Sequence, residues 1–196
     1  DGHLQQEWWS HSAYPEQMGL DATMIDHIEV LRGPASALYG SLGFQAIINI
    51  VTRRGSDQNW GSGTLQLENL SGYRAVLNIG HRFKNGLEFG VSATGKYSIG
   101  DSYTYPELTM NQLCLPEFPR SCNNGKTNRD ADRGTNAAIY AHVNYKGLSV
   151  KASYQLLDKH WPISAYRSVF NDPANKFTTQ RAYLDVGYDV GDARTV

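Results

Sequence analysis

The residue types best suited to chemistry in this chain are a few histidines and carboxylates near its start. His3, Glu7 and His11 are spaced four residues apart, which on a helix would align three metal-ligating side chains on one face. The two tryptophans after Glu7 and the later Pro15 disfavour a stable helix, so we predict no metal site there. The chain also has no G-x-S-x-G and no H-E-x-x-H motif, and we predict neither enzymatic activity nor a cofactor.

Further carboxylates are spread along the chain at Glu68, Glu88, Asp185 and Asp189. They lie in separate alternating segments, which does not suit a general acid–base pair. We interpret them as part of a solvated polar face that also carries Arg74, Arg82, Lys96, Lys151 and Arg181. The formal net charge is −1, so no overall field attracts a nucleic acid, and we expect no nucleic-acid partner.

The chain from Gly63 onward alternates apolar and polar residues, which is the period of a β-strand with two unlike faces. The apolar positions form six runs: Leu65 and Leu67, Tyr73 to Phe83, Leu87 to Tyr97, Ala137 to Tyr145, Leu148 to Leu156, and Ala182 to Val190. A length of about ten residues suits a tilted strand that crosses a membrane. We therefore predict a largely antiparallel β-structure for this part of the chain.

Two tight turns set the register of neighbouring runs. Lys84-Asn85-Gly86 has the composition of a three-residue hairpin loop, and Lys146-Gly147 that of a two-residue loop. These turns place Phe83 opposite Leu87, Tyr145 opposite Leu148 and Val143 opposite Val150. A slip of one residue would mix the two faces, so the turns and the alternation agree. We predict three consecutive antiparallel hairpins over residues 63–190.

The connections between runs differ in length. Each of the two tight turns is followed by a long polar segment, roughly residues 99–133 and 159–178, and Gly191-Asp192 predicts another tight turn. Short turns at one end and long loops at the other are typical of outer-membrane β-barrels, although alternation alone also suits a soluble β-sandwich. The mean hydropathy is −0.48, and no apolar run approaches the length of a transmembrane helix. Aromatic residues near the run ends suit the interfacial girdles of a barrel: Tyr73, Phe83, Tyr97, Tyr145 and Tyr188.

The segment before residue 56 has a different pattern. Its predicted elements are a strand at Ile28–Leu31, a turn at Arg32-Gly33-Pro34, one or two helical turns at Ala35–Tyr39 that end at Gly40, and a strand at Ala46–Thr52. The second strand is nearly all apolar and β-branched, so we predict that it is buried on both faces. Upstream, Asp21 is a good N-cap for a short helical turn over Ala22–Ile25.

This segment resembles the end of the plug domain of TonB-dependent outer-membrane receptors. The family pattern is similar to I-E-V-L-R-G-P-x-S-A-L-Y-G, a short gap, and a strand like V-I-N-I-I-T. The matching residues are Ile28, Glu29, Val30, Leu31, Arg32, Gly33, Pro34, Ser36, Ala37, Leu38, Tyr39 and Gly40, followed by Ile48, Asn49, Ile50 and Thr52. The chain departs from the pattern at Asp26-His27 and at Gln45-Ala46.

The resemblance implies a fold and an organisation. Residues 1–55 would be the C-terminal part of a mixed α/β plug and residues 56–62 a linker. Residues 63–196 would be the first antiparallel transmembrane strands of a partial, plugged barrel, which has 22 strands in the family. The polar face would line the lumen, and the chain would be an internal piece of a longer protein. The motif residues Glu29, Arg32, Gly33, Pro34, Leu38, Tyr39, Gly40 and Asn49 would have structural roles.

The resemblance also implies a function in the outer membrane of a Gram-negative bacterium. Receptors of this family carry out ligand-gated uptake of a scarce, bulky solute such as a ferric siderophore, cobalamin or haem. The partners would be the lipid bilayer, the solute and the energy-transducing TonB protein, which would engage an N-terminal segment that this chain lacks. Two alternatives remain: a passive porin or adhesin barrel, which would lack a plug, and a soluble β-rich binding module.

Two features lie in segments with little regular pattern. Trp8, Trp9, His11 and Tyr14 follow an Asp-Gly pair that in the family leads into the plug apex, and we expect them to contact the solute. The alternative is that the tryptophans wedge the plug against the barrel wall. Cys114 and Cys122 are separated by seven residues in a polar loop, and we expect a local disulfide because the zinc alternative lacks further ligands nearby.

Overall fold

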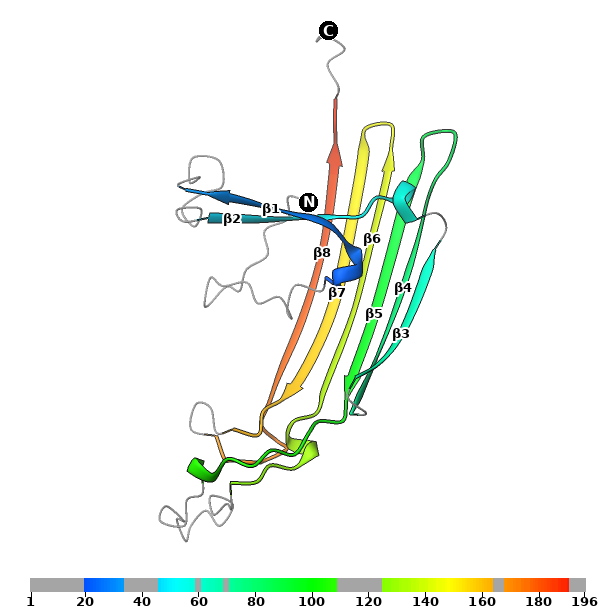
Figure 1. Cartoon of the computed structure of the whole chain (residues 1–196). Helices are drawn as coiled ribbons and strands as arrows, with labels where there is room; N and C mark the ends of the chain where they lie inside the picture. The colour runs from blue at the N-terminus through cyan, green and yellow to red at the C-terminus, as the bar shows by residue number, and fades with distance from the viewer. Residues whose placement is uncertain are drawn as a thin grey trace.

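The structure, a computed structural model, describes residues 20–33, 46–58, 61–68, 71–108, 125–163 and 168–190. These residues form a two-stranded sheet and a six-stranded sheet (Figure 1). The strands of the large sheet are β3 (Ser62–Glu68), β4 (Gly72–Arg82), β5 (Glu88–Ser98), β6 (Gly134–Tyr145), β7 (Leu148–His160) and β8 (Lys176–Tyr188). Each strand pairs antiparallel with the next, so the prediction of consecutive hairpins is confirmed.

The register predicted from the two tight turns is also confirmed. The backbone N–H of Phe83 donates to the carbonyl of Leu87 at 2.8 Å, and Tyr145 lies opposite Leu148. Lys146 and Gly147 have φ angles of +46° and +85°, which are the paired positive values of a type I′ turn. This turn matches the right-handed twist of the flanking strands, so it joins β6 and β7 without a bulge.

In the large sheet the apolar face is more exposed than the polar face, which is the reverse of a soluble protein. On the apolar face, Leu77 is 49% exposed and Leu184 is 67% exposed. On the polar face, Ser92 is 3% exposed and Gln155 is 2% exposed. A soluble sandwich would bury the apolar face instead. The large sheet therefore presents its apolar side outward and keeps its polar side against the rest of the chain.

Aromatic residues lie near both ends of the apolar face. The rings of Tyr73 and Tyr97 are 5.4 Å apart near one end, and those of Phe83 and Phe89 are 6.1 Å apart near the other. Tyr145 and Tyr188 lie at the same end as Phe83. Tyr145 is the last residue of β6, before the turn into β7, and Tyr188 is the last residue of β8. In the part of the chain that the structure describes, no helix is long and apolar enough to cross a membrane.

The described parts of the long connections, residues 99–108, 125–133, 161–163 and 168–175, lie at one end of the large sheet and the two tight turns at the other (Figure 1). We call these the long-loop end and the tight-turn end. The connection between β3 and β4 is short yet lies at the long-loop end. The predicted separation of short turns from long loops is therefore incomplete, because an antiparallel meander places every second connection at the same end, whatever its length.

The small sheet pairs β1 (Ile25–Arg32) antiparallel with β2 (Ala46–Thr52), whose bounds agree with the sequence prediction. The predicted helical turn is a 3-10 helix, η2 (Ala22–Met24), and Asp21 caps it by accepting a hydrogen bond from the Thr23 N–H at 2.9 Å. Another 3-10 helix, η3 (Gly55–Gln58), overlaps the predicted linker, residues 56–62. The predicted helical turns at residues 35–39 lie outside the described residues.

The prediction that β2 is buried on both faces is wrong. Ile48 is 65% exposed, and its neighbours across the sheet, Ile28 and Val30, are more than half exposed. Within the described ranges, β1 and β2 pair only with each other, and their shared apolar face is largely exposed. Apolar composition indicates what a strand is able to bury, but burial also needs a second layer.

Candidate functional site

The base of the small sheet, where β1 begins and β2 ends, lies with its adjoining turns against the polar face of the large sheet, and this contact is the candidate site (Figure 1). We call it the inter-sheet contact. One side of it consists of Asp21, Thr23, Thr52 and Gly55, and the other of Arg74, Asn78, Glu88, Thr94 and Tyr140. Most of its members are polar, so directed hydrogen bonds determine its geometry.

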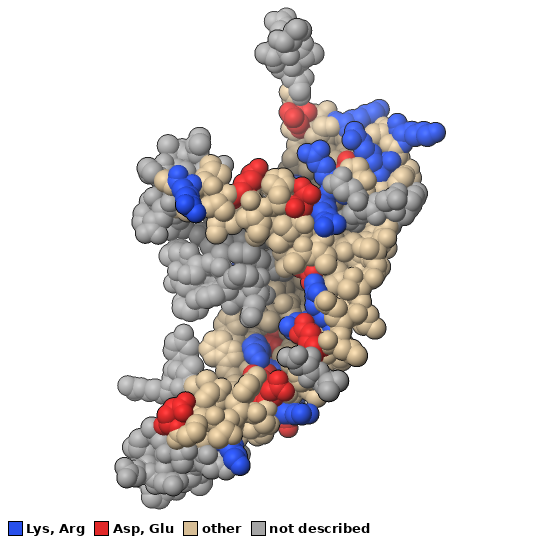
Figure 2. Space-filling view, viewed as in Figure 1, with Lys and Arg blue, Asp and Glu red and all other residues tan. Residues whose placement is uncertain are grey.

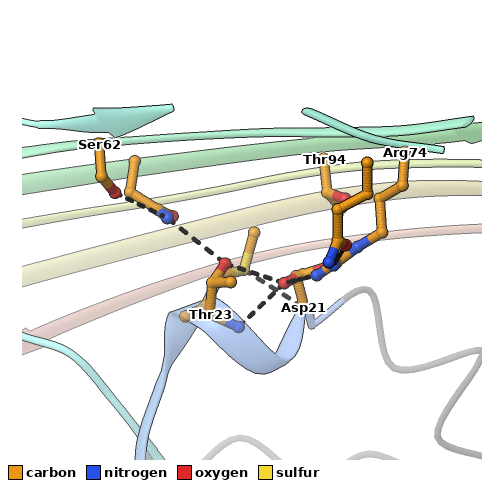
Figure 3. Close-up of polar contacts among 8 residues, drawn as sticks. Asp21, Thr23, Ser62, Arg74 and Thr94 are labelled. Carbon is orange, nitrogen blue, oxygen red and sulfur yellow. Dashed lines mark hydrogen bonds and ion pairs between the residues drawn. The ribbon is translucent and has the colours of Figure 1, made fainter. Parts of the chain in front are cut away.

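The centre of the inter-sheet contact is an ion pair between Asp21 and Arg74 (Figure 3). The Arg74 Nε donates to Asp21 Oδ2 at 2.9 Å, and Arg74 Nη2 donates to both carboxylate oxygens. The side chains are 9% and 18% exposed, so the pair is largely shielded from solvent. Gln66 accepts from Arg74 Nη1, and the Thr94 hydroxyl donates to Asp21 at 3.4 Å. A planar guanidinium held in this way has little freedom to reorient.

The Asp21 carboxylate also shapes the turn that carries it. Besides capping η2, it accepts from the Thr23 hydroxyl at 2.8 Å, and that hydroxyl accepts from Asn78 Nδ2 at 3.3 Å (Figure 3). Met24 at the end of η2 is only 1% exposed. One carboxylate therefore caps the start of the 3-10 helix and also binds the large sheet. The local fold and the inter-sheet contact thus depend on the same group.

Two further hydrogen bonds attach the C-terminal end of β2, and the turn after it, to the large sheet. The Thr52 hydroxyl donates to Tyr140 Oη at 3.2 Å, and the Gly55 N–H donates to Glu88 Oε1 at 2.9 Å. Glu88 is 7% exposed, so this hydrogen bond satisfies a buried carboxylate. A Cβ atom at Gly55 would lie 2.0 Å from the Phe89 carbonyl oxygen, so the close approach requires glycine.

The two attachments are joined to each other through the backbone. The N–H of Arg53, just after β2, donates to the carbonyl of Met24 at 2.8 Å, and its guanidinium Nε donates to the Ile25 carbonyl at 3.3 Å. The beginning of β1 and the end of β2 therefore form one base that is bound to β4, β5 and β6. The opposite end of the small sheet, at Arg32 and Ala46, has no such bond to the large sheet in the described part of the chain.

Two opposing effects set the pKa of Asp21. Burial alone would raise it, but the hydrogen bonds from Arg74 and Thr23 outweigh burial and hold the pKa below the ordinary value of 3.8. A depressed folded-state pKa means that ionised Asp21 stabilises the contact above the unfolded-state pKa, and that this stabilisation is lost as the pH falls through the folded-state pKa.

We therefore expect the inter-sheet contact to weaken as the pH falls below about 4. Hydrogen-exchange protection factors of the Thr23 and Arg53 amides, measured at pH 6 and pH 3, should decrease at the lower pH. The Asp21→Asn variant is the control, because its side chain does not titrate and Asn still suits the N-cap. An equal decrease in the variant would show that other carboxylates cause the effect.

A polar cluster lies on one face of the small sheet. His27 Nδ1 lies 2.7 Å from Asp26 Oδ2, and Asn49 Nδ2 donates to Glu29 at 2.7 Å across the two strands. Hydrogen bonds to Asp26 and then Glu29 raise the pKa of the exposed His27. Elsewhere in the motif, Arg32 is exposed at the end of β1. Gly33, which follows it, has φ +110°, a conformation that favours glycine.

The structure describes only some of the residues predicted from the sequence. Outside the described residues lie His3, Glu7, Trp8, Trp9, His11, Tyr14, Pro34, Leu38, Tyr39, Gly40, Cys114 and Cys122. Among the described residues, no group of three or more His, Cys, Asp or Glu side chains suits a metal ion. Of the predicted polar face, Arg74 binds Asp21, Lys96 pairs with Glu68 at 2.8 Å, and Arg82 lies 4.0 Å from Glu88.

Sequence reasoning identified Asp21 only as a helix cap and Glu88 only as part of the polar face. Their partners, Arg74 and Gly55, are 53 and 33 positions away in the chain. Thr52, Asn78, Thr94 and Tyr140 were not identified as contact residues. The one available signal was the polar face itself, because a row of inward polar side chains requires polar partners.

Comparison with known proteins finds two short similarities. Over 43 residues the chain is 54% identical to the iron-regulated outer membrane virulence protein of Vibrio cholerae serotype O1, a match that covers 22% of this chain and 6% of that protein. Over 39 residues it is 51% identical to the ferrienterobactin receptor of Escherichia coli K12, which covers 20% of this chain and 5% of that protein. No family model and no solved structure matches. The similarity is thus to one protein named for the outer membrane and to one named as a ferrienterobactin receptor, over a small part of the length of each.

Proposed function

We propose that this chain is part of a TonB-dependent outer-membrane receptor that takes up an iron-carrying siderophore or a similarly bulky solute. The observation that carries the proposal is the inverted large sheet, with its apolar face uncovered and its polar face bound to a second sheet. Water surrounds a soluble protein on all sides, so such a protein has no reason to adopt this arrangement. This arrangement suits a protein that has lipid on its outside and a filled, polar interior.

The dimensions of the large sheet support a membrane-spanning wall. The strands β4 to β8 are 11 to 13 residues long, enough to cross the hydrocarbon layer at a tilt. The aromatic pairs Tyr73–Tyr97 and Phe83–Phe89 lie near opposite ends of the apolar face, where the two lipid–water interfaces would be. Among the described strands, β3 and β8 each have one unpaired edge, at which the rest of a barrel would continue.

In this proposal the small sheet belongs to the plug, and the inter-sheet contact is where the plug binds the wall. A contact made of hydrogen bonds and an ion pair suits a gate, because water can replace each partner when the surfaces separate. An apolar contact of the same area would expose its surface to water on opening. The TonB protein would act through a segment that precedes this chain, and the remaining strands would follow it.

Uptake by the complete gene product tests the proposal. The complete gene product should be expressed in a Gram-negative strain that lacks its own siderophore receptors. The cells should then be supplied with a panel of radioactive ferric siderophores, cobalamin and haem. We expect saturable uptake of one class, lost in a strain without TonB or after the proton-motive force collapses. Uptake that is unsaturable and independent of TonB would identify a passive porin instead. A product recovered without membranes would identify a soluble module.

We also expect the segment around Trp8 to contact the solute. Replacing Trp8 or His11 with alanine in the complete receptor should weaken solute binding at the cell surface by about 2 kcal/mol, roughly thirtyfold, because large aromatic anchors dominate such sites. Trp60→Ala is the control, since it removes the same side chain from the predicted linker. Unchanged affinity in a folded, inserted Trp8→Ala receptor would mean that these residues only pack against the wall.

A further inference from the structure

Four lysines, two at each end of the large sheet, differ in their partners. At the long-loop end, Lys159 pairs with Asp132 at 2.8 Å and Lys176 with Asp158 at 3.1 Å. At the tight-turn end, Lys84 and Lys146 lie in the two turns, are exposed, and have no carboxylate within 4 Å among the described residues. Figure 2 shows mostly Lys and Arg side chains at this end, with a few acidic ones beside the end of β8, whereas basic and acidic residues intermingle more evenly at the other.

The two lysines border an aromatic band on the apolar face. Phe83 precedes the first turn, and its ring stacks on Phe89 at 6.1 Å. At the second turn, Lys146 Nζ lies 5.2 Å from the centre of the Tyr145 ring. Tyr188, on the neighbouring strand, is 67% exposed. Aromatic rings at this position mark the level of lipid headgroups, so the lysines just beyond them are at the level of the phosphates.

The spacing of the turns places the two charges side by side along the membrane plane. One turn joins β4 to β5 and the other joins β6 to β7, and β5 pairs with β6. The turns are therefore two strand spacings apart, about 10 Å. Each ammonium has three N–H donors and acts as a point charge, which suits phosphate oxygens approached from several directions.

We propose that Lys84 and Lys146 bind the phosphates of anionic phospholipids, such as phosphatidylglycerol, in the leaflet that the tight turns reach. This inference rests on the proposed function, because it requires lipid against the apolar face. A zwitterionic headgroup carries its own cation beside the phosphate, so it offers less net charge to the lysines. A basic residue near an anionic bilayer surface contributes about 1 kcal/mol, which corresponds to roughly a fivefold preference for the anionic lipid per lysine.

The test uses the complete receptor reconstituted in phosphatidylcholine vesicles with trace spin-labelled lipids. The protein should retain labelled phosphatidylglycerol in preference to labelled phosphatidylcholine, and high salt should reduce this preference. The variant with Lys84→Gln and Lys146→Asn should lose most of it, and Asn is chosen because it tolerates the positive φ of that turn position. Lys84→Arg with Lys146→Arg should retain it.

A matched variant at the long-loop end, Lys126→Gln with Arg129→Gln, removes the same charge and should leave the preference unchanged. Soluble glycerophosphate should not displace the labelled lipid, because the site takes a headgroup held beside the aromatic band. Equal lipid preference in the wild type and the tight-turn variant would overturn the proposal. Failure of the wild-type receptor to insert would instead count against the proposed function, and unchanged solute uptake by the variant separates the two ideas.

Discussion

Replacing Asp21 with asparagine is expected to weaken the inter-sheet contact by about 2 kcal/mol, because it leaves the Arg74 guanidinium without its counter-ion in a largely shielded position. Arg74 keeps its bond to Gln66, which limits the loss. Asn still caps η2, so the variant separates the charge from the turn. Hydrogen exchange of the Gly55 amide, which donates across the contact to Glu88, should become roughly thirtyfold faster in the folded, reconstituted protein.

A double-mutant cycle with Arg74→Gln measures how much of this effect belongs to the pair. We expect a coupling free energy of about 1–3 kcal/mol between Asp21 and Arg74, because the two groups share a bidentate geometry. Lys96→Gln is the matched control on the same face: its partner Glu68 is 39% exposed, so its removal should change exchange less than fivefold. Additive effects of Asp21→Asn and Arg74→Gln would show that the ion pair does not hold the two sheets together.

The second large effect is expected for Gly55→Ala, which should destabilise the attachment of β2 by about 3 kcal/mol. The added Cβ would lie 2.0 Å from the Phe89 carbonyl oxygen, and that oxygen belongs to a paired strand that cannot move freely. Relieving this clash pulls the Gly55 N–H away from Glu88, which leaves a buried carboxylate without this donor. The amides of residues 53–58 should then exchange faster.

Gly63→Ala is the control for this effect. Gly63 lies in β3, and a Cβ there would meet no atom within 4 Å, so the substitution should be neutral or slightly stabilising. A Gly55→Ala protein as stable as the Gly63→Ala protein would contradict the close approach of η3 to β5. Under the proposed function, a Gly55→Ala receptor that inserts normally but takes up less solute would show that the attachment of β2 also matters for transport.

The strands and their register were predictable because both depend on local chemistry. Alternation between apolar and polar residues has a period of two, and a tight turn of given length allows one register only. Lys146-Gly147 illustrates this, since its positive φ angles pair Tyr145 with Leu148 as predicted. The cap at Asp21 was predictable for the same reason, because it depends on residues within one turn.

The burial of β2 and the partners of Asp21 depended on the tertiary structure. An apolar strand such as Ala46–Thr52 has the same composition whether or not another layer covers it. Asp21 and Arg74 are 53 positions apart, and no spacing rule relates a residue in a 3-10 turn to one on a distant sheet. Alternation is also symmetric, because it separates an apolar face from a polar one without indicating which face the rest of the chain contacts. The base of the small sheet lies on the polar face because it supplies hydrogen-bond partners to Arg74, Glu88 and Tyr140. These partners replace the hydrogen bonds that the three side chains would otherwise form with water.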